Sequence, residues 1–277
     1  MIYALFGNPV AQSLSPLMHN AALKAMGLAG CYVPLCIRHL PGAVQGLRGM
    51  DIRGVSVTIP FKSEIMEYLD DLDDEALRIG AVNTVVNDNG RLTGHNTDWH
   101  GLTRSLKEQV EVEGKTIVIL GAGGTARAAL YGVVKEGGHP VIVNRTDGKG
   151  RELAQDWGCP YAALKNIGKI KANILINTTP IGMFPHTDEK LVKEGVLARY
   201  DLVVDVIYNP LETSLLKAAV AAGCRTLSGL DMFVYQGAEQ LRLWTGQEPP
   251  RALMRQVVLE HLSSASGISS AGVKEQT

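Results

Sequence analysis

The segment Gly121-Ala122-Gly123-Gly124-Thr125-Ala126 has the glycine spacing of a dinucleotide-binding turn. It follows the apolar run 116–120 and opens a helical stretch to Lys135, which is the strand-to-helix context that this function requires. The first glycine permits the tight bend, the second lets the backbone approach a pyrophosphate, and the small Ala126 permits close helix-sheet packing. The helix N-terminus adds N–H donors and positive potential. We therefore expect residues 121–126 to bind a dinucleotide, with a ligand-free glycine turn as the alternative.

The end of the next apolar run indicates which dinucleotide binds. An NAD site carries Asp or Glu there to bond the ribose 2′-hydroxyl. This chain has Asn144-Arg145-Thr146, with Lys149 shortly after. Arg145 offers a planar donor fork, Thr146 a hydroxyl and Lys149 a second positive charge, all suited to a 2′-phosphate. The sequence predicts NADP, although Asp147 weakens the positive cluster and a solvent-exposed Arg145 is the alternative.

Polar side chains in the first hundred residues lie where regular elements are expected to begin or end. In α/β proteins such positions gather at one edge of a sheet and bind ligands. Each also has an ordinary structural interpretation, as a turn residue, a surface lysine or a helix N-cap. The residues are Ser13, Ser15, Thr58, Lys62, Asn83 and Asp98.

The first half of the chain alternates short apolar runs with amphipathic segments, which predicts an α/β layer with a mixed sheet. Ser15 is expected to cap its helix, with Pro16 in the first turn. Asn89-Gly90 predicts a two-residue hairpin turn. The expected strands are 2–6, 31–37, 54–57, 82–86 and 92–95, and the expected helices are 15–26, 61–69 and 73–79.

The second half carries continuous apolar strands, which are typical of a parallel sheet covered on both faces. They are expected at 116–120, 141–143, 174–176 and 202–206, forming a Rossmann-type NADP-binding domain. Two helices, 232–244 and 251–262, are too short to hold a core alone and should pack back on the first half. We expect a substrate domain of residues 1–100 and 231–262, an NADP domain of 101–230, and a disordered tail of 263–277.

The composition excludes several classes of protein. The formal net charge is -1 and aromatic residues make up 5% of the 277 residues, which argues against a nucleic-acid or membrane-surface binder. The four cysteines have no metal-ligand spacing, so we expect scattered buried thiols and no metal. We find no basic segment followed by an apolar run at the N-terminus and no apolar stretch of about 20 residues. We expect a cytoplasmic protein.

Taken together, the motifs resemble the shikimate dehydrogenase family along nearly the whole chain except the tail. That family reduces 3-dehydroshikimate to shikimate with NADPH in aromatic amino-acid biosynthesis. The matching segments, in order, are SLSPLMHN from Ser13, VTIPFK ending at Lys62, AVNT around Asn83, NTD ending at Asp98, GAGGTAR from Gly121, NRT at Asn144, NTTPIGM from Asn177, DVIYNP at Asp205 and VYQGAEQ around Gln236.

The resemblance implies roles for individual residues. Lys62 and Asp98 would be the catalytic pair, since a cation beside a ketone stabilises the developing alkoxide. The substrate carboxylate would lie near Ser13, Ser15 and Tyr208, and its ring hydroxyls near Thr58, Asn83, Asp98 and Gln236. Beyond the residues above, cofactor contacts would include Thr178, Met183 and Gly229, with Met232 near the nicotinamide.

The chain departs from the family pattern at Ser56, where Asn is usual, and at Trp99, where Gly is usual. His100 is a weak rival acid. These departures leave room for a broader quinate/shikimate dehydrogenase that uses NAD or NADP, which is the main alternative. A methylenetetrahydrofolate dehydrogenase and a non-catalytic NADP sensor fit the motifs less well. A small-molecule substrate and a monomeric or homodimeric state are expected.

Overall fold

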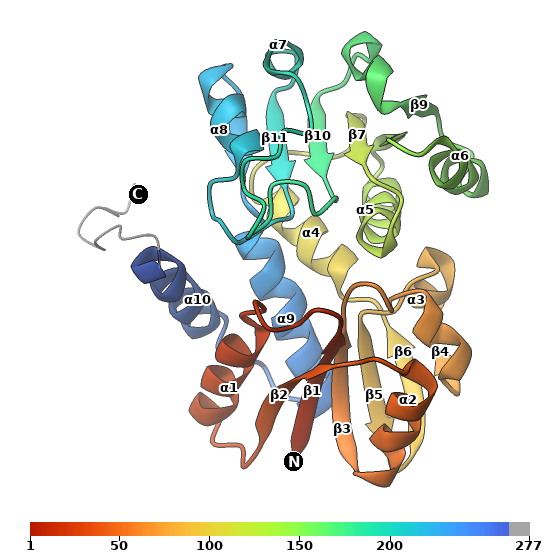
Figure 1. Cartoon of the computed structure of the whole chain (residues 1–277), viewed down its shortest axis with the longest axis vertical. Helices are drawn as coiled ribbons and strands as arrows, with labels where there is room; N and C mark the ends of the chain where they lie inside the picture. Colours follow the sequence, from red (N-terminus) through yellow and green to blue (C-terminus); the bar gives the residue numbers. More distant parts are fainter. Residues whose placement is uncertain (266–277) are drawn as a thin grey trace.

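Two six-stranded sheets dominate the computed structural model, which describes residues 1–265 apart from the side chains of Glu194 and Ala265. Figure 1 shows the sheets at opposite ends of the molecule, with α4 (Asp98–Lys107) and α9 (Gly229–Thr245) running between them. These two helices make extensive contact with each other. The two connections between the halves of the molecule therefore pack together.

The first sheet is mixed, as predicted. Its order is β2-β1-β3-β5-β6-β4; β1 pairs in parallel with β2 and β3, and β5 pairs antiparallel with β3 and β6. The strands are β1 (Ile2–Gly7), β2 (Cys31–Cys36), β3 (Ile52–Val57), β4 (Asp71–Leu72), β5 (Thr84–Asp88) and β6 (Arg91–His95). The helical segments are α1 (Ser15–Ala25), α2 (Leu40–Gly49), the 3₁₀ turn η1 (Glu64–Tyr68) and α3 (Asp74–Ile79).

The predicted Asn-Gly hairpin is confirmed. Asp88 pairs with Arg91, which leaves Asn89 and Gly90 as the two turn residues. Their φ angles of 51° and 94° are both positive, as a type I′ turn requires. This turn sets the register of β5 against β6 and thereby carries the chain back toward Asp98.

The second sheet is parallel throughout, and the Rossmann prediction is confirmed. Its strand order is β12-β11-β10-β7-β8-β9. Successive strands are added on one side of β7 as far as β9 and then, starting with β10, on its other side. The place between β7 and β10 is therefore the switch point at which α/β sheets open a ligand crevice. The strands are β7 (Thr116–Leu120), β8 (His139–Asn144), β9 (Tyr161–Ala163), β10 (Ile174–Asn177), β11 (Leu202–Asp205) and β12 (Arg225–Leu227). The helical segments are α5 (Gly124–Lys135), α6 (Asp147–Asp156), η2 (Leu164–Lys169), α7 (Glu194–Leu197) and α8 (Ser214–Ala221).

The C-terminal helices pack on the first sheet, as predicted. Figure 1 shows α10 (Arg251–Ala265) beside α1, and α9 behind the first strands. Tyr3 and Met18 are buried in one cluster with Leu241 of α9 and Met254 of α10. Apolar burial of this kind drives the association of the two chain ends. The domain boundaries at residues 100 and 231 stay predictions.

Several local predictions were wrong. The segment predicted as helix 61–69 forms only η1, because Leu69 turns extended and leads into β4. Helix α2 was missed, since its three glycines obscure the apolar spacing of Leu40, Val44 and Leu47. Ser15 is the first residue of α1 and makes no capping bond. Of the expected disordered tail, 263–265 continue α10 and the remainder lies outside the described residues.

All four cysteines are free, but the prediction that they are buried was wrong. Cys31 and Cys36 are exposed, and Cys159 and Cys224 are half-buried. Cys31 and Cys36 are the two end residues of β2, which is an edge strand of the first sheet, and this position leaves both accessible. Within residues 1–265, no helix is both long and apolar enough to cross a membrane, and no group of three or more metal-ligating side chains gathers.

His19 of α1 is buried under the first sheet. Its ring stacks on Tyr32 with 4.3 Å between centroids, and its Nδ1 lies 2.9 Å from the Ser15 carbonyl, to which it donates. Burial lowers the pKa of His19 to about 4, and the hydrogen bond to the Ser15 carbonyl partly offsets that effect. The ring is therefore neutral in the folded protein near neutral pH.

Between pH 7 and pH 5 the wild-type free energy of unfolding should fall by about 2 kcal/mol more than that of His19→Asn. The unfolded chain protonates His19 near its ordinary value of 6.5, whereas the folded state takes up that proton only near pH 4. Buried Asp205, whose pKa is raised to about 6 by desolvation, acts in the opposite direction in both proteins. Urea denaturation at the two pH values measures the difference, and equal pH dependence would contradict it.

Candidate active site

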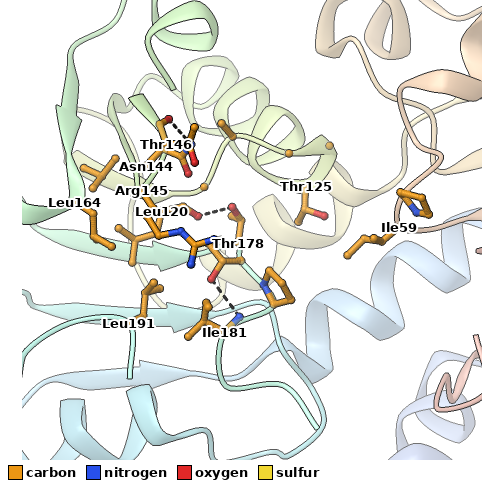
Figure 2. Close-up of a pocket in the computed structure, with 18 of the residues that line it drawn as sticks. Ile59, Leu120, Thr125, Asn144, Arg145, Thr146, Leu164, Thr178, Ile181 and Leu191 are labelled. Atoms are coloured by element: carbon orange, nitrogen blue, oxygen red, sulfur yellow. Dashed lines mark hydrogen bonds between the residues drawn. The ribbon is translucent and has the colours of Figure 1, made fainter. Parts of the chain in front are cut away.

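A cavity of about 440 Å³ opens where β7, β8 and β10 end. Figure 2 shows the Arg145 side chain extending into this cavity, with Thr178 beside it, Ile181 below it and Ile59 approaching from the first half of the chain. Of the predicted cofactor residues, nine line it: Gly121, Ala122, Gly123, Gly124, Thr125, Asn144, Arg145, Thr146 and Thr178. The structure therefore brings most of the predicted cofactor set to one place.

The glycine turn has the geometry that a phosphate cradle needs. Gly121 has a φ of +117°, and a Cβ there would lie 2.6 Å from the Thr178 hydroxyl. Gly123 precedes α5 at the N-cap position without any side-chain cap, and a Cβ at Gly123 would meet no atom within 4 Å. The first amides of α5 have no partners within the helix, so they can donate to an anion. Ala126 is fully buried in the core instead of lining the cavity.

The end of β8 presents no carboxylate to the cavity. Asn144 Nδ2 donates to the Thr146 carbonyl at 2.9 Å, which shapes the turn that presents Arg145. Asp147 accepts from the Tyr161 hydroxyl at 2.7 Å and lies 3.7 Å from Arg151. These partners lower the pKa of Asp147 and hold its charge outside the cavity lining. The residues present thus fit a nucleotide that bears a 2′-phosphate.

Besides Ala126, three predicted cofactor residues do not line this cavity. Lys149 is exposed on α6. Met183 lines the neighbouring cavity described next. Gly229 is buried at the start of α9, where a Cβ would lie 2.1 Å from the Val206 carbonyl oxygen, so close backbone packing explains the glycine.

A second cavity of about 640 Å³ adjoins the first, and Lys62, Thr125, Ile59, Pro180 and Ile181 line both. It collects the whole predicted substrate and catalytic set: Ser13, Ser15, Thr58, Lys62, Asn83, Asp98, Tyr208 and Gln236. These residues come from the segments that follow β1, β3 and β11, from the starts of β5 and α4, and from α9. The two cavities together offer a cofactor site next to a polar substrate site.

Lys62 and Asp98 form an ion pair where the cavities meet. Lys62 Nζ lies 2.5 Å from Asp98 Oδ2, and the two side chains are only 14% and 7% exposed. The other carboxylate oxygen accepts from Asn83 Nδ2 at 2.8 Å. Asp98 is the first residue of α4, and Thr97 holds the cap position, so the N-cap interpretation of Asp98 was wrong. Its carboxylate instead holds the ammonium group of Lys62.

A group of hydroxyls lines the far part of the second cavity. Ser13 Oγ lies 3.2 Å from Ser15 Oγ, and the Tyr208 hydroxyl accepts from the Leu14 amide at 3.3 Å. Burial raises the pKa of Tyr208, with hydrogen bonds from Leu14 and Ser13 opposing, so this hydroxyl stays protonated and can donate. Lys62 and His186 are the only basic side chains among the described residues of the lining. The arrangement suits a carboxylate held by neutral donors.

Two amides order the polar floor of this cavity. Asn83 accepts from the Thr97 amide at 2.7 Å, which fixes the Asn83 side chain that holds Asp98. Gln236 Nε2 donates to the Phe233 carbonyl at 2.8 Å, and its Oε1 lies 3.5 Å from Asn83 Nδ2. Asn83 therefore positions the Asp98 carboxylate and also lines the cavity.

Sequence reasoning missed Gln240, which lies one helical turn after Gln236 on the same face of α9. Ser56 Oγ donates to Gln240 Oε1 at 2.8 Å, and Gln240 Nε2 donates to the Asn83 carbonyl and the Thr84 hydroxyl. Two glutamines four residues apart on a buried helix were the available signal. Ser56 is thus held by Gln240 at the edge of the cavity.

The other departures lie outside both cavities. Trp99 packs edge-on against Tyr131 and lies under Lys135 Nζ at 4.2 Å, so it joins α4 to α5. His100 is exposed and lines a separate charged hollow with Arg104 and Glu239, which removes it as a rival acid. Met232 lines the second cavity and also belongs to the core under the second sheet.

A Rossmann half with a glycine turn and a basic strand end, joined to a cavity that holds a Lys-Asp pair, defines an NADP-dependent oxidoreductase. Comparison with known proteins specifies which one. The chain belongs to the shikimate dehydrogenase family. The model of the shikimate dehydrogenase substrate binding domain matches residues 5–85, and that of the shikimate 5'-dehydrogenase C-terminal domain matches residues 229–259.

Individual relatives cover nearly the whole chain. Shikimate dehydrogenase (NADP(+)) of Methanothermobacter thermautotrophicus is 43% identical over 265 residues, covering 91% of this chain and 94% of that protein. Shikimate 5-dehydrogenase from Thermus thermophilus, crystallised with NADP(H) and shikimate, is 35% identical with a TM-score of 0.86, covering 94% and 99%. Quinate dehydrogenase from Corynebacterium glutamicum in complex with NAD is 31% identical with a TM-score of 0.85, covering 94% and 99%.

Proposed function

We propose that this protein catalyses the reversible reduction of 3-dehydroshikimate to shikimate with NADPH. The observation that carries the proposal is the bonded Lys62–Asp98 pair at the junction of the two cavities. When bound, NADPH supplies a hydride to the ketone carbon. The ammonium group of Lys62 stabilises the negative charge that develops on the ketone oxygen and donates the proton that completes the hydroxyl, and Asp98 orients that ammonium group.

The substrate would lie across the second cavity. Ser13, Ser15 and Tyr208 donate to its carboxylate. The ring hydroxyls bond Thr58, Asn83, Asp98 and Gln236, whose side chains can donate or accept, apart from the accepting carboxylate. Such a site recognises a polyhydroxylated acid through hydroxyl and amide groups, and no arginine is among the described residues that line it.

Initial rates with shikimate and quinate, each with NADP⁺ and NAD⁺, test this proposal. We expect shikimate with NADP⁺ to give the highest kcat/KM, because Arg145 favours a 2′-phosphate. The alternative is a broader quinate/shikimate dehydrogenase that uses NAD or NADP. Similarity to the quinate enzyme favours that alternative, and comparable kcat/KM for quinate or NAD⁺ would establish it. Absence of turnover with every pair would refute both.

Ser13→Ala and Tyr208→Phe should each raise the KM for shikimate about tenfold, because each loses a hydroxyl that donates to a carboxylate. The KM for NADP⁺ should not change. Steady-state kinetics measure both constants. Ser105→Ala is the matched control, since the Ser105 hydroxyl bonds the Leu102 carbonyl and lines neither cavity. Wild-type KM values in both variants would place the carboxylate elsewhere.

The remaining expectations belong to the same proposal. Residues 1–100 with 231–262 would bind the substrate and residues 101–230 the cofactor. The protein would act in the cytoplasm as a monomer or homodimer. Size-exclusion chromatography with light scattering measures the oligomeric state directly.

A further inference from the structure

Lys62 touches the cofactor half of the molecule as well as Asp98. Its Nζ lies 3.2 Å from the Thr125 hydroxyl, and a Cβ added to Gly124 would lie 3.0 Å from Lys62 Cβ and 3.1 Å from its Cδ. The lysine stem thus rests against the glycine turn along its length. The atoms of the predicted cofactor turn and the reactive ammonium group are in direct contact.

Thr125 is placed to control that contact. It is the second residue of α5, so its backbone is set by the helix and its hydroxyl lies at the helix N-terminus. It lines both cavities and also a smaller hollow beside Tyr208 and Met183. Figure 2 shows Thr125 at the edge of the first cavity that faces Ile59, between the glycine turn and the first half of the chain.

The number of N–H donors on Lys62 explains what its contact with Thr125 can do. An ammonium group has three N–H bonds. One is directed to Asp98 Oδ2 and a second to Thr125 Oγ1, which fixes the torsion about the terminal C–N bond. The third N–H then has one direction left, and the Lys62 side chain lines the second cavity. With Asp98 as sole acceptor, the flexible lysine stem could pivot about that one hydrogen bond.

We propose that Thr125 is a positioning residue that aims the third N–H of Lys62 at the ketone oxygen, aligned with the cofactor half that carries the hydride donor. This inference rests on the proposed function. It differs from the ordinary role of the turn, in which Thr125 contributes only to binding the pyrophosphate. The two roles have opposite kinetic signatures. Loss of positioning lowers kcat, whereas loss of a phosphate contact raises the KM for NADPH.

The test compares Thr125→Val, which keeps the shape and removes the hydroxyl, with Thr125→Ser, which keeps the hydroxyl. We expect Thr125→Val to lower kcat about 10- to 100-fold, with both KM values within about twofold of wild type. Thr125→Ser should retain most of the turnover. With NADPH deuterated at the transferred hydrogen, the primary isotope effect should increase in Thr125→Val, because hydride transfer becomes slower relative to other steps. Ser105→Ala, which removes a hydroxyl that bonds the Leu102 carbonyl and lines neither cavity, is the control.

A double-variant cycle with Lys62→Ala shows whether Thr125 acts through the lysine. In that background Thr125→Val should cause no further loss of rate. Equal losses with and without Lys62, or a raised KM for NADPH at unchanged kcat, would overturn the proposal.

A second readout does not need turnover. Pulse labelling with an amine-reactive reagent, read by mass spectrometry, should modify Lys62 several-fold faster in Thr125→Val than in wild type or Ser105→Ala. The reason is that the ammonium group loses an acceptor. If wild-type protein does not turn over shikimate, the proposed function is refuted. If Lys62 is nevertheless labelled faster in Thr125→Val than in wild type, the Lys62–Thr125 coupling still holds. Unchanged labelling would refute the coupling whatever the activity.

Discussion

Replacing Lys62 by alanine is expected to lower kcat by about 10²–10³-fold while the protein stays folded and still binds shikimate. The ammonium group acts on charge that develops during hydride transfer, so its loss affects turnover more than ground-state binding. Lys62 lies in the turn after β3 and its side chain is not part of an apolar core, so alanine creates no large cavity. Steady-state rates, a shikimate titration and circular dichroism separate these quantities.

Lys24→Ala is the matched control, because Lys24 is exposed on α1 and lines neither cavity. Asp98→Ala should also be severe. The double variant should lose less than the sum of the two single losses in free energy, because the bonded pair acts as a unit. Near-normal turnover of Lys62→Ala would make Lys62 an ordinary cleft residue and would remove the basis of the proposed mechanism.

Replacing Arg145 by alanine is expected to weaken NADP⁺ binding about 10- to 150-fold and NAD⁺ binding little, which corresponds to a charge-assisted contact of about 1.5–3 kcal/mol. Only NADP⁺ carries the 2′-phosphate that a guanidinium can bond in a bidentate manner. Calorimetric titration of both dinucleotides measures the two losses. Arg151→Ala is the control, because Arg151 lies on α6 near Asp147 but does not line the cavity. Equal losses for both dinucleotides would refute the 2′-phosphate assignment.

Features that depend on local chemistry could be predicted from the sequence. The glycine turn at 121–126 and the Asn89-Gly90 hairpin each need backbone conformations or close approaches that few residues permit. The parallel sheet could be predicted because strands buried on both faces are apolar throughout. Helix α2 could not, since its stability comes from Leu40, Val44 and Leu47 packing under the first sheet and not from its glycine-rich composition.

The site was less accessible to prediction for a related reason. Lys62 and Asp98 are 36 residues apart, and their contact depends on the pairing of β3, β5 and β6. The residue types were visible, and the resemblance to a family supplied their roles, but the bonds of Asn83 to Asp98 and of Gln240 to Ser56 follow only from tertiary packing. Lys149 and Gly229 lie outside the lining of both cavities, and their cofactor contacts stay predictions.

The return of α9 and α10 to the first sheet also determines when each half can be completed during synthesis on the ribosome. The second sheet is built from residues 116–227 and has all its strands once β12 has emerged. The first sheet has all its strands after residue 95, yet Tyr3, Leu5 and Met18 still lack the cover that Val234, Leu241 and Met254 provide. Trp244, whose indole N–H donates to the Val85 carbonyl, arrives later still than most of α9. Domains usually fold from the N-terminus onward as they are made. In this chain the residues that are synthesised first are the last to be buried. The core of the second sheet, in the middle of the chain, is therefore completed before the core that contains the N-terminal residues.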